Sequence, residues 1–427
     1  MEMKLCAWRL RLFRAARSGL GAECGRLPCL GITLNAMASI DDPSSPKGQR
    51  IMALVEWYPP AFEAGGPIRS VHNLMQLLKA QTTHSLEVVC GATDLGGDEV
   101  LPGITPNQRV DQGGVAVTYT TPEHRSLRAW RKRLQGSSDQ PRPDTLYLNS
   151  VFGTDFALRP LWVARSLGIR VVLAPRGMLG RGALQLKPAK KRLFLALARA
   201  LGWFKNVEWH ASTEQEKEEV LAQFPQATVH VALNVPLMSA PHVPMPLTPP
   251  LKLVMLGRIH PIKNLHFALE ALSKLDVQGS TVEVELVGPA EDGVYLNRLL
   301  DFSSGGLSVR HLGALPPEAL GKVWAKNHAL LMPTTHENFG HAVVEAWAHG
   351  RPVLLSDRTP WKGLREESTG WDEPLDPESW ERALQDMLTW DDDRWAAMSK
   401  ASLDKHRNLM KDSALVADNV RLFEVSG

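Results

Sequence analysis

Short apolar runs alternate with segments of helical spacing along most of the chain from Ile51 onward. In the first half, the apolar runs are "RIMALVEWYPP", "SLEVVCGA", "GVAVTYT", "DTLYLNS", "RVVLAPRG", "VEWHAST" and "ATVHVALN". Near-continuous apolar strands separated by helices are typical of a parallel sheet that is covered on both faces. The pattern predicts a doubly wound, Rossmann-like α/β domain over residues 49–236.

A proline-rich stretch, "PLMSAPHVPMPLTPP", then interrupts the alternation, and residues 237–250 are predicted to be a linker. After it, strands are predicted at "LKLVMLGRI", "TVEVELVG", "LSVRHLG", "HALLMPT" and "RPVLLSD". They predict a second Rossmann-like domain over residues 251–405. The tail from about Pro377 is expected to be mostly helical, and residues 406–427 are expected to form a helix that returns to the first domain.

The composition excludes several classes of protein. Of 427 residues, 44% are hydrophobic and the net charge is only +2, so a nucleic-acid partner is not expected. No apolar run reaches the length of about 18 residues that a membrane span needs. The four cysteines, Cys6, Cys24, Cys29 and Cys90, make a disulfide framework improbable and favour a reducing cytosol.

Residues 1–48 are treated as a basic leader outside the fold. They contain no clean apolar core followed by a cleavage site, so a secretory signal is not predicted. Two interpretations stay open: a basic, surface-seeking arm, or a true start at Met37. A metal site at Cys24 and Cys29 is disfavoured, because no second pair of ligands follows.

Two such domains in series place a cleft between the carboxyl ends of their strands, where open α/β sheets bind ligands. "HENFGHAVVEAW", starting at His336, follows the strand at "HALLMPT" and enters a helix. Gly340 and His341 are predicted in its first turn, whose free N–H groups and dipole suit a phosphate. Glu337 and Glu345 are expected to accept hydrogen bonds from sugar and ribose hydroxyls.

Two cations follow the first strand of the same domain. Arg258 and Lys263 lie five positions apart in "LVMLGRIHPIKN", next to Gly257. Charge-assisted hydrogen bonds from such side chains stabilise a bound anion by about 1.5–3 kcal/mol each. The helix terminus adds about 0.3–1 kcal/mol. The two cations therefore favour a diphosphate site, whose ligand the helix terminus mainly orients, and a solvated surface pair is the alternative.

The first domain contributes two further candidate segments. In "EAGGPIR", Gly65 and Gly66 follow the first strand and permit close approach of a ligand, while Arg69 is expected to open the next helix. The segment does not fit Gly-x-Gly-x-x-Gly, which argues against nicotinamide binding. In "APRGML", Arg176 and Gly177 end another strand, and both an acceptor or phosphate contact and a plain turn remain open.

Metal chemistry is not predicted at any of these segments. His336 and His341 are five apart, whereas a metalloprotease helix places its two histidines four apart. Asp391 and Asp393 form the one close match to Asp-x-Asp, but they lie between predicted helices, where an aspartate is expected to cap a helix.

Together these segments resemble the retaining glycosyltransferases of the GT-B fold, the family called glycosyl transferases group 1. Its signature, a glutamate, seven residues and a second glutamate, matches Glu337 to Glu345, with Asn338, Phe339 and Gly340 inside it. "APRGML", "HASTEQE" and "LLSDRTPW" resemble a bacterial branch that builds exopolysaccharide, capsule or O-antigen. The resemblance covers residues 50–427, and "PRG" stands where many relatives have a His-Gly pair.

The resemblance implies a UDP- or GDP-linked sugar donor, transfer with retention at the anomeric carbon, no metal and no cofactor. By the same resemblance, Arg258, Lys263 and Glu337 are catalytic. The donor-binding residues that it implies are Gly65, Gly66, Gly257, Leu315, Asn338, Phe339, Gly340, His341 and Glu345. Arg69, Arg176 and Gly177 would face the acceptor, and Leu315 in "HLGALPP" would contact the base.

A basic and apolar stretch suggests where the acceptor is held. "KPAKKRLFLALARALGWFK" contains no acidic residue and carries Phe194, Trp203 and Phe204. Such a helix either lies on an anionic membrane surface, where a lipid-linked saccharide acceptor would be found, or packs on the sheet with solvated charges. The expected place is the cytoplasm, at the inner face of the plasma membrane.

Two other classes of function stay open. One is a sugar-nucleotide epimerase or a phosphorylase with a similar fold, although no pyridoxal-binding lysine motif is found. The other is a non-catalytic protein that binds sugar nucleotides, which would be expected to lose Glu337, Arg258 or Lys263.

Overall fold

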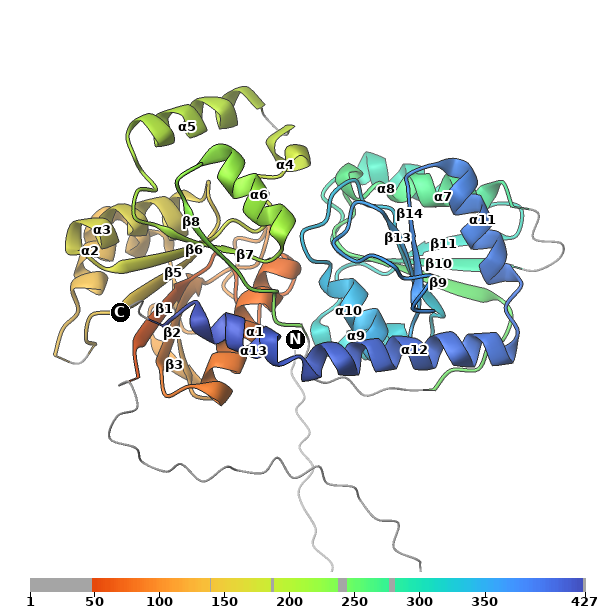
Figure 1. Cartoon of the computed structure of the whole chain (residues 1–427), viewed down its shortest axis with the longest axis horizontal. Helices are drawn as coiled ribbons and strands as arrows, with labels where there is room; N and C mark the ends of the chain where they lie inside the picture. Colours follow the sequence, from red (N-terminus) through yellow and green to blue (C-terminus); the bar gives the residue numbers. More distant parts are fainter. Residues whose placement is uncertain (1–47, 139, 186–187, 237–243, 276–280, 425–427) are drawn as a thin grey trace, which may run out of the picture. The chain divides into compact units, whose positions relative to one another are not determined.

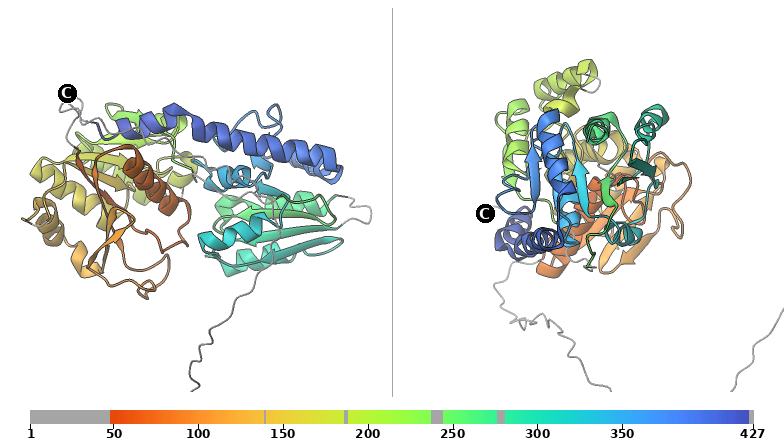
Figure 2. Two further views of the ribbon diagram at one scale, coloured as in Figure 1. Left: turned by 90° about the horizontal axis from the view of Figure 1, so that it is seen from below. Right: turned by 90° about the vertical axis from the view of Figure 1, so that its right-hand side faces the viewer.

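The computed structural model of the protein describes residues 48–138, 140–185, 188–236, 244–275 and 281–424. Residues 47–427 belong to one compact unit, which contains two sheets flanked by helices (Figures 1 and 2). Residues 1–47 of the predicted leader, with Met37, Cys6, Cys24 and Cys29, lie outside the described residues. Residues 237–243 of the predicted linker lie outside them too.

The first sheet has eight strands in the order β3-β4-β2-β1-β5-β6-β7-β8. They are β1 (Arg50–Leu54), β2 (Ser85–Gly91), β3 (Arg109–Gln112), β4 (Val115–Thr120), β5 (Thr145–Asn149), β6 (Arg170–Ala174), β7 (Glu208–Ala211) and β8 (Thr228–Val231). All neighbours pair in parallel except β3 with β4. Ile51 and Ala53 enter the core on one face, and Met52 and Leu54 enter the core on the other, because successive side chains alternate.

Helices connect these strands. They are α1 (Gly66–Gln81), η1 (Pro122–Arg125), α2 (Leu127–Gln135), η2 (Thr154–Leu158), α3 (Arg159–Leu167), α4 (Arg181–Gln185), α5 (Pro188–Ala200) and α6 (Glu214–Gln223). The Ser126 hydroxyl caps α2 and the Thr213 hydroxyl caps α6, as expected of these residue types. Helix α1 begins at Gly66 with Pro67 in its first turn, so the prediction that Arg69 opens it is wrong by three residues.

The second sheet has six strands in the order β11-β10-β9-β12-β13-β14, all parallel. They are β9 (Leu251–Leu256), β10 (Val282–Val287), β11 (Leu307–His311), β12 (Ala329–Met332), β13 (Val353–Ser356) and β14 (Gly370–Glu373). Its helices are η3 (Pro261–Lys263), α7 (Leu265–Ser273), α8 (Gly293–Leu300), α9 (Pro317–Trp324), α10 (His341–Ala348) and α11 (Pro377–Leu388). Two hydrophobic cores cover its faces, with Leu253 in one core and Val254 in the other.

Two helices end the described chain. Helix α12 (Asp392–Lys411) packs against α10, and α13 (Ser413–Arg421) packs against α1 (Figure 1). Leu422 and Phe423 then enter the core of the first sheet. The Asp391 carboxylate accepts from the N–H of Arg394, which confirms that this aspartate caps a helix. The domain boundaries proposed from the sequence stay predictions.

The predicted fold class, two Rossmann-like domains built on parallel sheets, is confirmed. Among the described residues, no helix combines the length and the apolar character that crossing a bilayer requires.

Candidate active site

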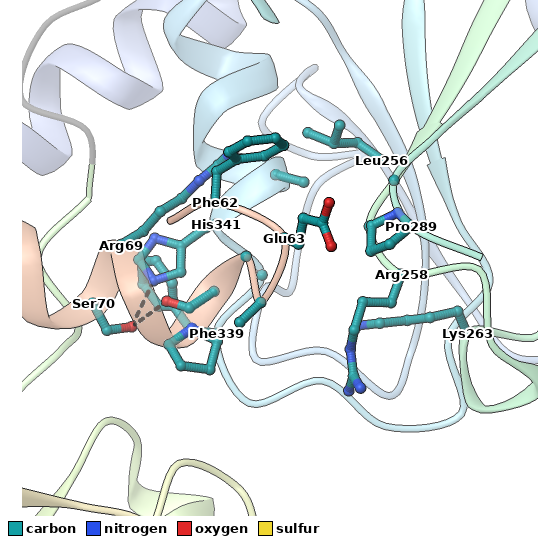
Figure 3. Close-up of a pocket in the computed structure, with 18 of the residues that line it drawn as sticks. Phe62, Glu63, Arg69, Ser70, Leu256, Arg258, Lys263, Pro289, Phe339 and His341 are labelled. Atoms are coloured by element: carbon teal, nitrogen blue, oxygen red, sulfur yellow. Dashed lines mark hydrogen bonds between the residues drawn. The ribbon is translucent and has the colours of Figure 1, made fainter. Parts of the chain in front are cut away.

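A cavity of about 430 Å³ lies where the carboxyl ends of strands from both sheets meet (Figure 3). The predicted site residues that line it are Gly65, Gly66, Arg69, Arg176, Gly257, Arg258, Lys263, Leu315, Glu337, Asn338, Phe339, Gly340 and His341. Gly177 and Glu345 are not among the lining residues. The structure therefore brings together most of the candidates, from segments nearly 300 positions apart.

Lys263 and Glu337 form an ion pair in this cavity. The ammonium Nζ lies 2.7 Å from the Glu337 carboxylate, and both side chains are mostly buried. Lys263 ends η3, in which the Ile262 N–H donates to the ring of the N-cap residue His260 at 3.2 Å. Glu337 is held by its own N–H, which donates to the Arg358 carbonyl at 3.1 Å. Burial opposes ionisation of Glu337, but Lys263 and the Asn338 N–H outweigh it and lower the pKa of this carboxyl.

Arg258 supplies the second predicted cation. Its guanidinium donates to Glu291 at 2.8 Å, and both side chains are exposed to solvent, 45% and 39% respectively. Such exposed pairs stabilise a protein by about 0–1 kcal/mol, so a bound anion would displace Glu291 at little cost. Figure 3 shows Arg258 and Lys263 extending toward the same part of the cavity.

The N-terminus of α10 reaches the cavity, as the sequence predicts. Gly340 is the N-cap, with φ of 81°, and His341 is the first helical residue. The His341 ring lies 2.8 Å from the Ser70 hydroxyl of α1. Burial, followed by the charges of Arg69 and Arg176, holds the pKa of His341 well below its usual range. His341 is therefore neutral, and its side chain already has a partner from the first domain.

Glu345 does not line the cavity, although its partner Arg69 does. Its carboxylate forms a close ion pair with Arg69 of α1, and it is buried. Burial lowers the pKa of Arg69 to about 10, so its guanidinium remains charged at neutral pH. The ribose contact proposed for Glu345 stays a prediction, because it requires this ion pair to open.

The segment at "PRG" is fixed by buried polar contacts. Three side-chain oxygens accept from the Arg176 guanidinium, and they belong to Asn149, Asn234 and Tyr147. The Gly177 N–H donates to the Glu216 carboxylate at 2.5 Å. From the sequence, a ligand contact and a turn were both possible here. The structure places Arg176 at the cavity, and Gly177 lies in a turn that the Met178 N–H closes by donating to the Pro175 carbonyl.

Asn338 and Phe339 link the cavity to its surroundings. The Asn338 amide donates to Ser212 at 2.9 Å and to Glu216 at 3.2 Å, both in the first domain. Phe339 is buried between His341 and Trp361. The backbone of this segment is thereby held against both domains.

Several residues of the cavity were not predicted from the sequence. Trp57, Phe62, Glu63 and Leu95 line it from the first domain. Figure 3 shows Glu63 projecting into the cavity from the loop before α1. Their position just after β1 and β2 was the available signal, because side chains at that edge of a parallel sheet face the ligand site.

No group of three potential metal ligands is found within the described part of the chain. His341 bonds Ser70 and His336 lies next to Gly180, so the two histidines do not converge. A zinc site at "HENFGH" is not supported by this arrangement.

Each half of the chain matches a known protein family. Residues 250–389 match the family described as "Glycosyl transferases group 1", and residues 65–234 match "Glycosyl transferase 4-like domain". Together the two ranges cover well over half of the 427 residues. A curated relative, D-inositol 3-phosphate glycosyltransferase of Corynebacterium urealyticum, is 29% identical over 152 residues, which is 33% of this chain and 35% of the relative. The chain thus matches about a third of the length of that curated relative.

Solved structures share the fold. Sucrose-phosphate synthase of Thermosynechococcus elongatus superposes with a TM-score of 0.64 at 16% identity, covering 88% of this chain and 98% of that one. Anabaena HepE in complex with UDP and glucose gives a TM-score of 0.59 at 16% identity with the same coverage. The architecture and the cavity between two Rossmann-like domains define the GT-B class. Both halves of the chain thus match glycosyltransferase domain families, and the chain as a whole shares the GT-B fold of these structures.

Proposed function

We propose that the protein is a retaining, metal-independent glycosyltransferase. It would move a hexose from a UDP- or GDP-linked donor to a saccharide acceptor in the synthesis of cell-surface polysaccharide. The observation that carries this proposal is the convergence of Arg258, Lys263, Glu337 and the N-terminus of α10 on one cavity. The complex of HepE with UDP and glucose supports a nucleotide-sugar donor of this kind.

The charges of the cavity suit a leaving nucleoside diphosphate. Arg258 and Lys263 each have only one carboxylate partner, Glu291 and Glu337 respectively, among the described residues. Phosphate oxygens would replace Glu291 and share Lys263 with Glu337. Negative charge grows on the phosphate as the bond to the sugar breaks, so fixed cations stabilise the transition state more than the bound donor.

The proposed step breaks the bond between the anomeric carbon and the phosphate oxygen. An acceptor hydroxyl forms the new bond on the same face of the sugar, and its proton passes to the departing phosphate oxygen. Glu337 would hold the sugar by accepting from its hydroxyls, because Lys263 keeps the carboxylate ionised and oriented. These roles, and those of the other lining residues, rest on the resemblance and on the geometry.

Arg258→Ala tests the proposal directly. We expect kcat to fall by about 100-fold while the Kd for the donor changes much less, since a charge-assisted bond made mainly in the transition state is lost. Arg298→Ala is the matched control, because Arg298 is also exposed and also pairs with one glutamate, Glu270. Wild-type kcat in Arg258→Ala would exclude the proposed role.

Donor hydrolysis without acceptor separates the proposed enzyme from a protein that only binds sugar nucleotides. A transferase is expected to release nucleoside diphosphate slowly from its own donor, and Glu337→Gln should abolish this release. A thermal-shift screen of UDP- and GDP-linked sugars identifies the donor, because only a ligand bound by the folded protein raises the Tm. An epimerase would instead return an isomerised sugar nucleotide.

We further propose that α5 holds the protein at an anionic membrane surface where a lipid-linked acceptor is found. Leu193, Leu197 and Leu201 lie four residues apart and are 63%, 44% and 63% exposed. They follow one face of α5 and its end. The surrounding Lys190, Arg192, Arg199 and Lys205 are exposed, so the apolar stripe is flanked by positive charge.

The aromatic residues of this stretch serve the core instead. Phe194 packs between Phe152 and Trp203, and Phe204 is buried against Trp209. The leucine stripe is thus the part of α5 that would contact acyl chains, with the basic side chains at the headgroups.

Flotation tests this contact. The wild-type protein is expected to float with vesicles of phosphatidylcholine and phosphatidylglycerol at low salt, and less so with phosphatidylcholine alone. Leu193→Gln/Leu197→Gln should stay in the soluble fraction. Val294→Gln is the control, because Val294 of α8 is 81% exposed on the second domain. Absence of wild-type flotation at low salt would remove the proposal.

A further inference from the structure

Arg176 differs from the other cations of the cavity in its partners. Arg69, Arg258 and Lys263 each contact a carboxylate: Glu345, Glu291 and Glu337 respectively. Within the described residues, the Arg176 guanidinium contacts no carboxylate; its three acceptors, in Asn149, Asn234 and Tyr147, are neutral. The structure therefore places on the first-domain wall of the cavity a cation that has no ion-pair partner of its own.

In the hydrogen bonds between Arg176, Tyr147 and His210, the donor and the acceptor of each bond can be assigned. The Ala232 carbonyl can only accept, so Nε2 of His210, 2.8 Å away, carries a hydrogen. Burial, followed by the charge of Arg176, lowers the pKa of His210 to about 3, so the ring is neutral and its Nδ1 is an acceptor. The Tyr147 hydroxyl therefore donates to Nδ1 at 2.7 Å, and its oxygen accepts from Arg176 at 2.7 Å.

This chain of bonds orients the guanidinium before any ligand arrives. Tyr147 and His210 are fully buried, and Asn149 and Asn234 are also buried. Arg176 itself adopts a φ of 55°, a left-handed conformation that non-glycine residues seldom occupy. Three of its five N–H groups are used, which leaves two as donors at a partly buried position on the cavity wall.

We propose that Arg176 binds an oxyanion of a substrate, a phosphate or a carboxylate group, on the first-domain side of the cavity. Tyr147 and His210 act as positioning residues for it. A planar guanidinium with two remaining N–H groups matches the geometry of such groups. A partly buried arginine without a carboxylate partner keeps a positive charge that a bound oxyanion would neutralise.

Two sources of that oxyanion follow from the proposed function, on which this inference rests. One is a phosphate of the donor, reached from the opposite side to Arg258 and Lys263. The other is an anionic group on the acceptor, such as a sugar phosphate or an acidic saccharide. D-inositol 3-phosphate glycosyltransferase, the curated relative, acts on an acceptor of the second kind by its name.

Calorimetric titration of the full chain distinguishes a donor oxyanion from an acceptor oxyanion. The protein is titrated with UDP and GDP, and then with inorganic phosphate at saturating nucleotide. Arg176→Gln is expected to weaken one of these ligands by about tenfold or more, and Arg176→Lys by less. Weaker phosphate binding with unchanged nucleotide binding indicates an acceptor oxyanion; weaker nucleotide binding indicates the donor. Kd values within twofold of wild type for both ligands, or no phosphate or nucleotide binding by the wild type, would overturn the proposal.

Tyr147→Phe tests the positioning role. It is expected to weaken the same ligand several-fold, because Arg176 loses one of its three partners. Tyr119→Phe is the matched control: Tyr119 is as deeply buried in the same sheet, its hydroxyl is also bonded, and it does not line the cavity. If both variants lose only thermal stability, the role of Tyr147 is structural and not positional.

The proposed function can fail separately from this inference. A wild-type protein that binds phosphate through Arg176, yet neither binds nor hydrolyses UDP- or GDP-linked sugars, would contradict the transferase and retain the oxyanion site. Conversely, the Arg176→Gln variant could hydrolyse the donor at the wild-type rate and bind all ligands with wild-type affinity. That result would support the transferase and contradict the oxyanion site.

Discussion

At the scale of single residues, Arg69, Arg258 and Lys263 of the cavity are each paired with a carboxylate before any ligand binds. Lys263 and Glu337 are close and mostly buried, whereas Arg258 and Glu291 are exposed. The two ion pairs differ in how strong an interaction a bound ligand must replace. Solvent already weakens the exposed pair, so a diphosphate would recruit Arg258 more readily than it would separate Lys263 from Glu337.

The buried pair predicts a specific pH dependence of stability. The pKa of Glu337 in the folded protein lies below the ordinary value of a glutamate carboxyl, so its ionised form stabilises the fold. This contribution is present at pH values above the unfolded pKa and is lost as the pH falls through the lowered folded pKa. The difference in Tm between wild type and Glu337→Gln should therefore be largest near neutral pH and shrink in acid.

Thermal unfolding across that pH range checks this expectation. Glu291→Gln is the control, because its exposed ion pair should contribute at most about 1 kcal/mol at any pH. A constant Tm difference between wild type and Glu337→Gln down to the lowest pH would show that ionisation of Glu337 does not stabilise the fold.

The sequence located these residues but not all of their partners. Arg258, Lys263 and Glu337 follow strands directly, and strand ends of parallel sheets meet at one edge, so their convergence was predictable. The contact of His341 with Ser70 was not, because 271 positions separate them and both look locally like ordinary helix residues. Neutral partners such as Asn234 carry no pattern that would connect them to Arg176.

At the scale of elements, the start of α10 depends on one backbone conformation. Gly340 has φ of 81°, and a Cβ there would lie 3.1 Å from a Val343 methyl and 3.4 Å from Glu337 Cγ. Gly168, the C-cap of α3, has φ of 64° with nothing near its Cβ position. Alanine substitutions at these two glycines therefore distinguish the loss of stability caused by the positive φ from the loss caused by steric contacts of the new Cβ.

Gly340→Ala is expected to lower stability by more than Gly168→Ala. The dihedral strain of about 1–2 kcal/mol is common to both, while displacement of Glu337 occurs only in the first. Donor affinity should fall only in Gly340→Ala, because the free N–H groups of α10 move with it. Chemical denaturation gives the stabilities and calorimetry gives the affinities; equal losses in both variants would contradict the role of the contacts.

Two strands were not predicted from the sequence, because few of their residues are buried. Strand β3 reads "RVDQ" and is almost fully exposed at the sheet edge, so it shows no apolar run. Strand β14 reads "GWDE" and has only two buried residues. Central strands such as β5 are buried throughout and were therefore visible. The polar pattern of an edge strand is indistinguishable from that of a loop without knowledge of its neighbour.

At the scale of the whole molecule, several polar contacts join the two domains around the cavity, and Leu233 of the first domain also packs on a hydrophobic core of the second. Arg69 contacts Glu345, and the amide of Asn338 contacts Ser212 and Glu216. The alternation of strands and helices predicted two domains and a ligand site between them. It could not predict that one glutamate of the signature would pair with an arginine of the other domain, because neither residue's neighbours in the sequence indicate the other.

A double-mutant cycle decides what Glu345 does. Removing either partner leaves a mostly buried charge, so Arg69→Met and Glu345→Leu should each cost about 3 kcal/mol or more. The double variant should cost less than the sum of both single variants, because no charge is left unpaired.

Calorimetric titration with UDP then shows whether Glu345 binds the ribose or serves only Arg69. If Glu345 binds the ribose, the double variant recovers stability but not affinity. If it serves only Arg69, the double variant binds UDP like the wild type. Strictly additive stability losses would mean that the ion pair does not couple the two domains.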